Sequence, residues 1–506
     1  MLYSEIASLY EKLEAEPSKL GKTAILADFL KKVPTNLLPK IVLFSQGLVF
    51  PKYLMLELGI AEQLMIRIIS RVTGISPSEV ENMFKKTGGL GTAAEELIKS
   101  KKQLTLVRKK LTVDFVFESL QKLPYITGKG SQERKLSLIA ELLASADPKE
   151  ATYIIRTILG ELRIGVAEGI IRDAIVDAFL FKEGMSKEEK TKLTEAVDYA
   201  WNILSDFSEV ARIAKEEDVV GLRKVKIKLG RPMQVMLGLS AESIESVVKE
   251  FGKVVAEYKY DGARVIVEKE GDKIWIYTRR QEDVTQQFPD IVEFALQGLK
   301  AKECVVEGEA LGIDPKTNKP VAFQQLSQRI HRKYEIKEMI KKIPVQVNLF
   351  DILYLDGKSL LDKPLKERIK ILGKVVKPIP GKFQIAKRII TDDVKTLEKF
   401  YHEALNEGQE GLMLKVMDAP YTFGRHVGAM YKIKPIMETL DLTIIGAEWG
   451  TGKRAKWITS YVLGCRDPDT GKFLSCGMMS TGLTEEQYQQ MTEAIKPLTI
   501  EEKGRT

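Results

Sequence analysis

A change in the spacing of apolar residues near residue 225 is the feature that most constrains the fold. Before it, apolar residues recur at helical spacing almost throughout, as in "RDAIVDAFLF". After the basic stretch "VVGLRKVKIKLGRPMQV", strand-like runs such as "KIWIYTRR" and "VQVNLFDILYL" alternate with helical segments. A helical region followed by a mixed region predicts separate hydrophobic cores, and a chain of 506 residues is too long for one.

We therefore predict a multidomain α+β protein with three domains. The first is an all-helical domain over residues 1–225, and the second is an α/β domain over residues 226–435. The remainder, residues 436–506, is β-rich until the short helical stretch "TEEQYQQMTEAI". It has the length of a small barrel or part of one.

Composition narrows the class of protein. The net charge of +8 favours a polyanionic partner, although only weakly over this length. Three cysteines and three histidines lie far apart, which argues against a zinc site and fits a reducing cytosol. The N-terminal stretch reads as a charged amphipathic helix rather than a signal peptide, and no apolar run could span a membrane. We expect a cytoplasmic protein with no membrane association.

The stretch "VVAEYKYDGARVIVE", residues 254–268, carries the first candidate for chemistry. It reads as a buried β-hairpin that turns at Asp261 and Gly262. Strand alternation would place Glu257, Lys259 and Asp261 on one face. The lysine could simply pair with Glu257 at a sheet surface, which is the common fate of a charged residue. It could also be a nucleophile that attacks phosphorus or carbonyl carbon. This stretch alone leaves both readings open.

Four further stretches add charged residues at predicted strand ends. They supply Arg279 and Arg280 in "TRRQED", Glu307 and Glu309 in "VVEGEALGI", Glu410 and Lys415 in "EGLMLK", and Lys432 and Lys434 in "YKIK". Paired carboxylates among several cations suit a metal–phosphate site, in which lysines neutralise phosphate oxygens and a carboxylate binds Mg²⁺. Glu410 and Lys415 have opposite strand parity, so both can face one cavity only if the backbone bends or bulges.

In their order, "KYDGAR", "RRQED", "EGEAL", "LFDILYLDG", "EGLMLK" and "YKIK" resemble an archaeal-type ATP-dependent DNA ligase, a member of the covalent nucleotidyltransferase superfamily. "TGKGSQERK" and "GELRIGVAEGIIRDAI" resemble the helical domain with which that family grips the minor groove of duplex DNA. The resemblance implies a helical DNA-binding domain, an adenylation domain and a C-terminal OB-type barrel. That family's barrel continues to an arginine-containing motif that orients the pyrophosphate of ATP, so we expect the barrel here to be truncated.

The resemblance also implies roles for residues of the predicted nucleotide site. Lys259 matches the nucleophile that attacks the α-phosphate of ATP and forms lysyl–AMP. Glu257 matches a residue that meets adenine, and Phe350 matches the aromatic ring that stacks on it. Taken alone, Phe350 reads as a core aromatic. Arg264 and Arg279 match arginines that contact ribose and phosphate.

The same resemblance implies a set of metal and phosphate ligands. Glu309 matches a carboxylate that binds the ribose hydroxyl and helps to place the metal, and Glu410 matches a second metal-associated carboxylate. Lys432 and Lys434 match paired lysines on the α-phosphate. ATP as co-substrate and Mg²⁺ or Mn²⁺ are therefore the implied cofactors.

Two matches to the family are less regular, and a third stretch departs from a general phosphate-binding motif. Arg425 lies near the position of a nucleotide-contacting arginine, with His426 as the alternative, and Tyr431 replaces the family's usual tryptophan. The stretch Gln103–Val107 lies where archaeal ligases carry a sliding-clamp motif, and a buried turn is the alternative there. "GTGKR" departs from the phosphate-binding loop pattern, so we read it as a basic turn that contacts the DNA backbone or only solvent.

The implied reaction has three steps. Lys259 takes AMP from ATP, AMP moves to the 5′-phosphate of a nick in double-stranded DNA, and the 3′-hydroxyl then displaces AMP. This is the chemistry of DNA replication, repair and recombination, and we expect a monomer. Within enzymes, the alternatives are an RNA ligase or an mRNA-capping guanylyltransferase, which lack such a long helical front end. A DNA-binding protein with a decayed nucleotide pocket is the alternative from another class.

Overall fold

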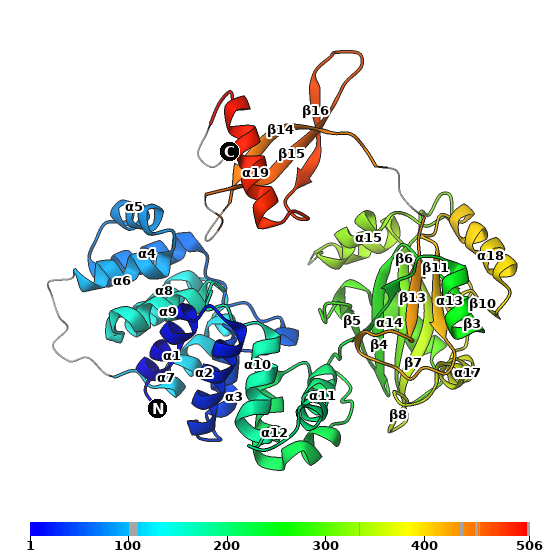
Figure 1. The fold of residues 1–506 in the computed structure, drawn as a ribbon, viewed down its shortest axis with the longest axis horizontal. Coiled ribbons are helices and arrows are strands. Elements are labelled where there is room, and N and C mark those ends of the chain that lie inside the picture. Colours follow the sequence, from blue (N-terminus) through cyan, green and yellow to red (C-terminus); the bar gives the residue numbers. More distant parts are fainter. Residues whose placement is uncertain (101–109, 333, 436–438, 451–453, 455, 503–506) are drawn as a thin grey trace. The chain divides into compact units, whose positions relative to one another are not determined.

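The structure is a computed structural model that describes residues 1–100, 110–332, 334–435, 439–450, 454 and 456–502 (Figure 1). The chain forms two compact units, Met1–Pro435 and Ile436–Thr506. Within the described residues, no helix is both long and apolar enough to cross a membrane.

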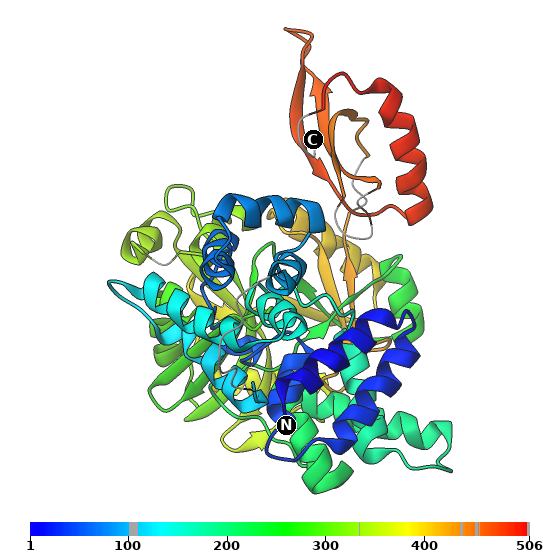
Figure 2. The same ribbon diagram turned by 90° about the vertical axis from the view of Figure 1, so that its left-hand side faces the viewer.

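Helices dominate the first part of the larger unit (Figures 1 and 2). They are α1 (Tyr3–Ala15), α2 (Lys19–Lys32), α3 (Leu38–Ser45), α4 (Glu62–Thr73), α5 (Pro77–Thr87), α6 (Leu90–Lys99), α7 (Val113–Gln121), α8 (Ser131–Ser145), α9 (Pro148–Ile158), α10 (Glu168–Ile175), α11 (Lys187–Leu204) and α12 (Phe207–Arg223). Capping residues in the neighbouring sequence fix where helices begin. At the start of α11, for example, the Ser186 hydroxyl accepts from the N–H of Glu189 (3.1 Å) and the Glu189 carboxylate accepts from the N–H of Ser186 (2.7 Å).

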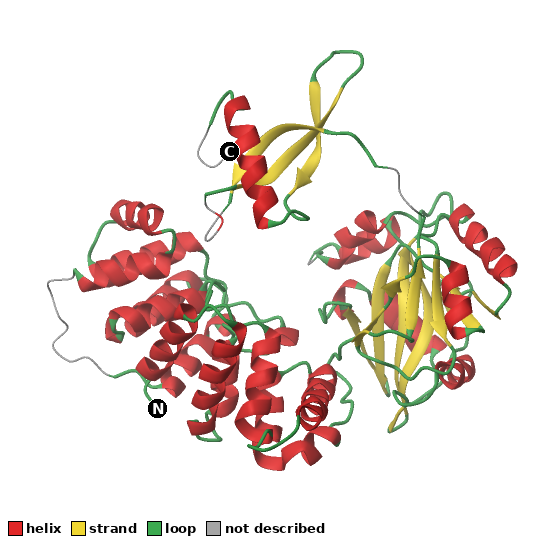
Figure 3. Ribbon diagram, in the orientation of Figure 1, coloured by secondary structure: helices red, strands yellow, loops and turns green. Residues whose placement is uncertain are grey.

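The second part of this unit is built on two large β-sheets, and β1 pairs with β12 in a third sheet of two short strands (Figure 3). One sheet has the order β10-β3-β11-β13-β2, and the other has the order β5-β4-β6-β7-β8 with β9 also paired to β7. The strands are β1 (Met236–Leu237), β2 (Leu239–Ser240), β3 (Val254–Tyr258), β4 (Ala263–Glu270), β5 (Lys273–Thr278), β6 (Glu303–Gly312), β7 (Val345–Leu355), β8 (Lys358–Ser359), β9 (Phe383–Ile385), β10 (Arg388–Thr391), β11 (Leu412–Val416), β12 (Gly424–Arg425) and β13 (Met430–Ile433).

Each sheet has its own hydrophobic core. Helices α14 (Pro289–Gly298) and α17 (Leu365–Val375) contribute to the core of the β5-β4-β6-β7-β8 sheet, which also receives Leu326 from α15 (Phe323–Ile330) and Met339 from α16 (Ile336–Lys342). Helices α13 (Ile244–Phe251) and α18 (Val394–Asn406) cover the other sheet, where Val247 and Phe400 meet Leu412 of β11. The helical-to-mixed transition predicted near residue 225 falls between α12 and β1.

The hairpin predicted over residues 254–268 is wrong. β3 and β4 lie in different sheets, so Asp261 and Gly262 connect two sheets rather than two paired strands. Gly262 is needed for close approach instead of a turn conformation. A Cβ at this position would lie 2.4 Å from the carbonyl oxygen of Ala310. The connection leaves Lys259 beyond the end of β3, where the two sheets face each other.

The smaller unit contains β14 (Thr443–Trp449), β15 (Ile458–Arg466), β16 (Phe473–Met479) and α19 (Glu485–Ile495). The strands pair antiparallel in the order β14-β15-β16, and α19, red in Figure 2, lies along this sheet. Ile458 and Tyr461 of β15 pack against Tyr488 of α19. The predicted strands and helix of this region are present, whereas closure into an OB-type barrel stays a prediction.

Candidate active site

A cavity of about 900 Å³ in the larger unit is lined by side chains from both sheets. Its lining includes every residue proposed from the sequence for the nucleotide and metal site: Glu257, Lys259, Arg264, Arg279, Glu309, Phe350, Glu410, Arg425, Lys432 and Lys434. Residues from stretches that are far apart in the sequence therefore meet around one space. The structure brings the predicted residues together, while the role of each stays a prediction.

Lys259 is fixed by its backbone and paired through its side chain. Its N–H donates to the carbonyl oxygen of Gly411 (2.8 Å), and its own carbonyl accepts from the N–H of Glu410 (2.8 Å). The Lys259 ammonium forms an ion pair with the Glu410 carboxylate. The alternative in which Lys259 pairs with Glu257 is therefore wrong, because its partner comes from the segment before β11.

Glu410 is shared by two lysines. Its Oε2 lies 2.7 Å from Lys434 Nζ and also contacts Lys259. Burial tends to raise the pKa of the Glu410 carboxyl, but hydrogen bonds from Lys259 and Lys434 outweigh it and lower the pKa below its usual range. Gly411, with φ +130°, interrupts strand geometry directly after Glu410. This break, and not a bulge within β11, lets Glu410 and Lys415 line the same cavity.

Three further cations line the part of the cavity that contains Lys259 and Lys434. Arg279 follows β5, Arg425 ends β12, and Lys432 lies on β13. None of the three forms an ion pair with a described residue. Burial lowers the pKa of Lys432, and the positive charges of Lys434, Arg425 and nearby cations lower it further. This end of the cavity thus carries an excess of positive charge.

The two carboxylates predicted to share a face of β6 have different environments. Glu307 is fully buried, accepts a hydrogen bond from Arg264 Nη2 (2.8 Å) and another from the Tyr421 hydroxyl (2.9 Å), and does not line the large cavity. Glu309 is half-buried and lines it. Burial raises the pKa of Glu309 to about 7, although Arg264 and Lys259 act in the opposite direction. Only Glu309 of the pair is therefore available to a ligand in the cavity.

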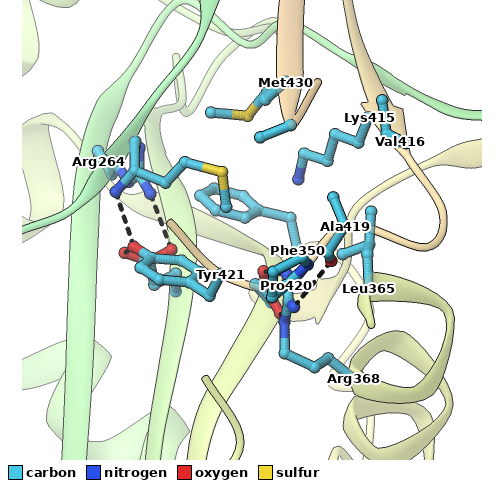
Figure 4. Close-up of a pocket in the computed structure, with 14 residues that line it drawn as sticks. Arg264, Phe350, Leu365, Arg368, Lys415, Val416, Ala419, Pro420, Tyr421 and Met430 are labelled. Atoms are coloured by element: carbon cyan, nitrogen blue, oxygen red, sulfur yellow. Dashed lines mark hydrogen bonds and ion pairs between the residues drawn. The ribbon is translucent and has the colours of Figure 1, made fainter. Parts of the chain in front are cut away.

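Phe350 of β7 lies between two cations (Figure 4). Lys415 Nζ is 4.3 Å from the ring centroid, and the guanidinium carbon of Arg264 is 5.3 Å from it. The ring lines the cavity and lies outside the hydrophobic clusters of the described residues. The reading of Phe350 as a core aromatic is therefore wrong, and its place favours contact with a ligand.

Two family models match the chain. Residues 235–434 match "ATP dependent DNA ligase domain", and residues 2–176 match "DNA ligase N terminus". The DNA ligase of Nanoarchaeum equitans is 44% identical over 513 residues, which cover 100% of this chain and 88% of that protein. Those of Thermococcus fumicolans and Archaeoglobus fulgidus are each 42% identical, with the same coverage. The chain belongs to the ATP-dependent DNA ligase family.

The fold is similar to that of a solved structure, Pmar-Lig_PreS3. It superposes with a TM-score of 0.57 and 16% identity over 97% of this chain and 91% of that one. The family models and the archaeal relatives named above confirm the resemblance inferred from the six ordered motifs.

Several ligase motifs can now be placed in the structure. Of the two neighbours that could match the family's arginine, Arg425 lines the cavity and His426 does not. Tyr431, in place of the family's tryptophan, is buried and accepts a hydrogen bond from the N–H of Gly428 (2.9 Å). The stretch Gln103–Val107 and most of "GTGKR" lie outside the described residues. Arg454, at the end of that motif, lies over the ring of Tyr488 (5.1 Å).

Sequence reasoning missed two residues that contact the carboxylates beside the cavity. Tyr421 links Glu307 to the N–H of Met236 (2.9 Å), and Arg388 lies 3.0 Å from Glu257 Oε1. The sequence analysis gave neither residue a role. The only possible signal for Arg388 was its position directly opposite Glu257 on paired strands, and strand register between distant segments is not visible in one sequence.

Proposed function

We propose that this chain is an ATP-dependent DNA ligase that seals nicks with 5′-phosphate and 3′-hydroxyl ends in duplex DNA, in replication, repair and recombination. The observation that carries the proposal is the place of Lys259. It lies in a 900 Å³ cavity together with the aromatic ring of Phe350 and the cations Lys432 and Lys434. A nucleophilic amine, a flat apolar surface and clustered positive charge are the three elements that nucleotidyl transfer from ATP requires.

In the first step, Lys259 Nζ attacks the α-phosphorus of ATP. A nitrogen–phosphorus bond forms, and the bond from that phosphorus to the pyrophosphate oxygen breaks. The amine must lose its proton before it can attack, and its Nζ is held by the ion pair with Glu410. We therefore expect this pair to separate when ATP binds. The neighbouring cations Lys432 and Lys434 neutralise the phosphate oxygens.

The other end of the cavity would hold the nucleoside. Phe350 offers a face for the adenine ring, and the buried carboxylate of Glu257 lies beside it, because Lys415 contacts both residues. Arg264 and Arg279 are our candidates for contacts with ribose and phosphate. Arg264 is already held by Glu307, so it can orient a ligand without first losing side-chain freedom.

Glu309 and Glu410 are the candidates for binding Mg²⁺ or Mn²⁺. The described residues contain no cluster of three or more potential metal ligands. This donor set still fits Mg²⁺, because that ion commonly uses one or two carboxylates together with substrate phosphates and water. When bound, the ion would offset the negative charge that develops on the transferring phosphate. Glu309, with its pKa raised to about 7, can release its proton to solvent when a cation binds near neutral pH.

The later steps act on DNA. AMP passes to the 5′-phosphate of the nick, and the 3′-hydroxyl then attacks that phosphate and releases AMP. The net charge of +8 and the helical part, which matches the ligase N-terminal family, support duplex DNA as the partner. We further propose that the chain acts as a monomer, that residues 436–506 belong to an OB-type domain, and that Gln103–Val107 contacts a sliding clamp.

A labelling experiment tests the first step. The protein is incubated with α-labelled ATP and Mg²⁺, denatured, and examined for label on the chain. We expect label on wild type and on Lys253→Ala, an exposed lysine just before β3, and none on Lys259→Ala. Equal labelling of both variants would contradict the proposed nucleophile.

Nick sealing tests the remaining steps. Wild type should join a 5′-labelled nick in duplex DNA with ATP, and GTP should not replace ATP. A pre-adenylated nick supplied without ATP bypasses the first step, so Lys259→Ala is expected to retain part of its sealing activity on that substrate. Labelling by GTP in preference to ATP would instead favour a guanylyltransferase. The absence of both labelling and sealing would contradict the enzymatic function.

A further inference from the structure

Two of the three cysteines lie on neighbouring strands of the smaller unit. Cys465 belongs to β15, and Cys476 belongs to β16, which is an edge strand of the sheet. Both are free and exposed to solvent, whereas Cys304 of β6 is fully buried. Burial raises the pKa of the Cys304 thiol to about 12, so this thiol stays protonated and unreactive. The chain thus carries two accessible thiols close together and one inert thiol elsewhere.

The turn between β15 and β16 fixes how these strands are aligned. The N–H of Gly471 donates to the carbonyl oxygen of Asp467 (2.9 Å), and the N–H of Asp467 donates to the carbonyl oxygen of Lys472 (2.8 Å). Just before this turn, Cys465 lies directly opposite Leu474 on the antiparallel strands. Because hairpin register follows from the turn, the position of Cys465 relative to β16 is well defined.

A β-bulge in β16 brings the second cysteine toward the first. The register shifts between Leu463 and Gly464 of β15, and Cys476 is the extra residue that has no partner in the ladder. Its thiol donates a hydrogen bond to the carbonyl oxygen of Leu474 (3.7 Å), the residue opposite Cys465. Interaction with the Cys476 thiol also raises the pKa of the Cys465 thiol above its usual value. The two exposed sulfurs therefore interact within one hairpin.

We propose that Cys465 and Cys476 form a reversible disulfide bond, which makes this hairpin a redox-sensitive modification site. The oxidant is a small soluble disulfide. One cysteine thiolate attacks a sulfur of the oxidant, forms a mixed disulfide and releases one small thiolate. The second cysteine thiolate attacks the protein sulfur of the mixed disulfide, forms the Cys465–Cys476 bond and releases the second small thiolate. Two protein thiols are thereby oxidised, the oxidant is reduced to two thiols, and these take up the two protons that the cysteines lose.

The bond acts on a strand that has little other support. β16 is exposed along almost its whole length, and among the described strands it pairs only with β15. Such an edge strand opens locally more easily than a buried one. A disulfide between the two strands removes most of these open conformations, so oxidation holds β16 against β15. Because the bond is accessible to solvent, small thiols can reduce it again, as a switch in a reducing compartment requires.

The test treats the full chain with glutathione disulfide and measures its mass and its free thiols. Wild type should lose two thiols without gaining glutathione, and dithiothreitol should restore both. In Cys465→Ser and in Cys476→Ser the remaining thiol has no partner to complete the exchange, so each variant should keep one glutathione as a mixed disulfide. Ser475→Ala is the matched control, because it changes an exposed residue of the same strand and removes no thiol, and it should behave as wild type.

Hydrogen exchange measures the effect on the strand. Amides of β16 should exchange about tenfold more slowly in oxidised than in reduced wild type, while oxidant should not slow them in Cys476→Ser. Unchanged exchange in oxidised wild type would overturn the proposal, since the bond would then not hold β16 against β15.

Three further results would overturn the proposal. They are attachment of glutathione to both cysteines of wild type, a disulfide that joins two chains rather than two strands, and thiols that stay reduced throughout. None of these measurements requires ATP or DNA, so their outcome is independent of the proposed ligase activity.

Discussion

The two ends of the cavity hold their charges in opposite ways. At the end that contains Phe350, which we call the base end, Glu257 is paired with Lys415 and Arg388. Arg264, on the other side of the ring, is paired with Glu307. Every one of these charges has an opposite charge within about 3 Å.

At the end that contains Lys259, which we call the phosphate end, positive charge is in excess. Lys259 and Lys434 share the single carboxylate of Glu410. Arg279 and Lys432 have no ion-pair partner among the described residues. Mutual repulsion contributes to the lowered pKa of Lys432.

This difference suits the two ends to different tasks, selection of the nucleotide at the base end and catalysis at the phosphate end. Paired, buried charges have fixed directions, so they can read the pattern of donors and acceptors on a base at little cost in reorganisation. Unpaired cations repel one another until a polyanion arrives, so they favour triphosphate binding and the negative charge that develops during transfer. The base end should therefore govern which nucleotide reacts, and the phosphate end should govern how fast it reacts.

The largest expected effect comes from removing one unpaired cation. Lys432→Gln should slow lysyl–AMP formation by about a hundredfold, mainly in kcat, because it removes charge stabilisation that is strongest in the transition state. The preference for ATP over GTP should remain as in wild type. Single-turnover labelling with both nucleotides measures the two quantities.

Lys387→Gln is the matched control for this variant. Lys387 is exposed, pairs with Glu403 (2.7 Å) and Glu407 (3.0 Å), and does not line the cavity. Its loss should leave kcat within about twofold, as surface ion pairs contribute little. If Lys432→Gln changed the nucleotide preference and left kcat unchanged, the division between the two ends would be wrong.

The second prediction concerns the dependence of metal use on pH. Glu309 has a pKa raised to about 7, so below that pH its carboxyl is mostly protonated and a cation must displace the proton. The Mg²⁺ concentration needed for half-maximal labelling should therefore fall as pH rises, by at most about tenfold per pH unit below pH 7, and level off above it. Titrations with Mg²⁺ between about pH 5.5 and pH 8.5 measure this dependence.

Glu309→Gln supplies the comparison. The amide cannot titrate, so the variant should need more Mg²⁺ and lose the pH dependence below pH 7. A wild-type profile that persists unchanged in Glu309→Gln would show that another group titrates. Glu410 does not offer the same signal, because its lysine partners lower its pKa.

The sequence predicted the contents of the cavity better than its architecture. Each site residue inferred from motif order lines the cavity, because covalent chemistry on a nucleotide restricts residue types and their order strongly. The hairpin over residues 254–268 was predicted from local turn preference. It is wrong because β3 pairs with distant β10 and β11, and those pairings outweigh the preference of two residues.

The sequence also could not predict which charged residues pair with one another. Glu307 and Glu309 are two residues apart on one strand, which predicts equal access to a ligand. Arg264 and Tyr421 bind Glu307, and only the fold places Tyr421 there. For the same reason, the simplest interpretation of the sequence wrongly paired Glu257 with Lys259. Its cations, Lys415 and Arg388, follow it by more than a hundred residues in the chain.

The third prediction tests the base end through its ring. Phe350→Leu should raise KM for ATP by about tenfold and leave kcat nearly unchanged, because base–aromatic stacking contributes about 1–3 kcal/mol to binding. Phe383→Leu makes the same chemical change in the core of the same part of the chain, where the ring is fully buried. It should lower the unfolding temperature without changing KM. If Phe350→Leu lowered kcat alone, the ring would act in catalysis rather than in nucleotide binding, and its assignment to the base end would be wrong.

The smallest expected effect separates the two ends without mutation. Salt screens charges that solvent reaches, and it affects buried pairs much less. Raising ionic strength from about 0.05 M to about 0.5 M should therefore increase KM for ATP a few-fold, because Lys434 and Arg279 at the phosphate end are exposed. The preference for ATP over GTP should stay constant, since Glu257 is 2% exposed and its partners are buried or nearly so. A preference that decreased in parallel with ATP affinity would mean that nucleotide selection also depends on solvent-exposed charge, and the base end would then have no separate role.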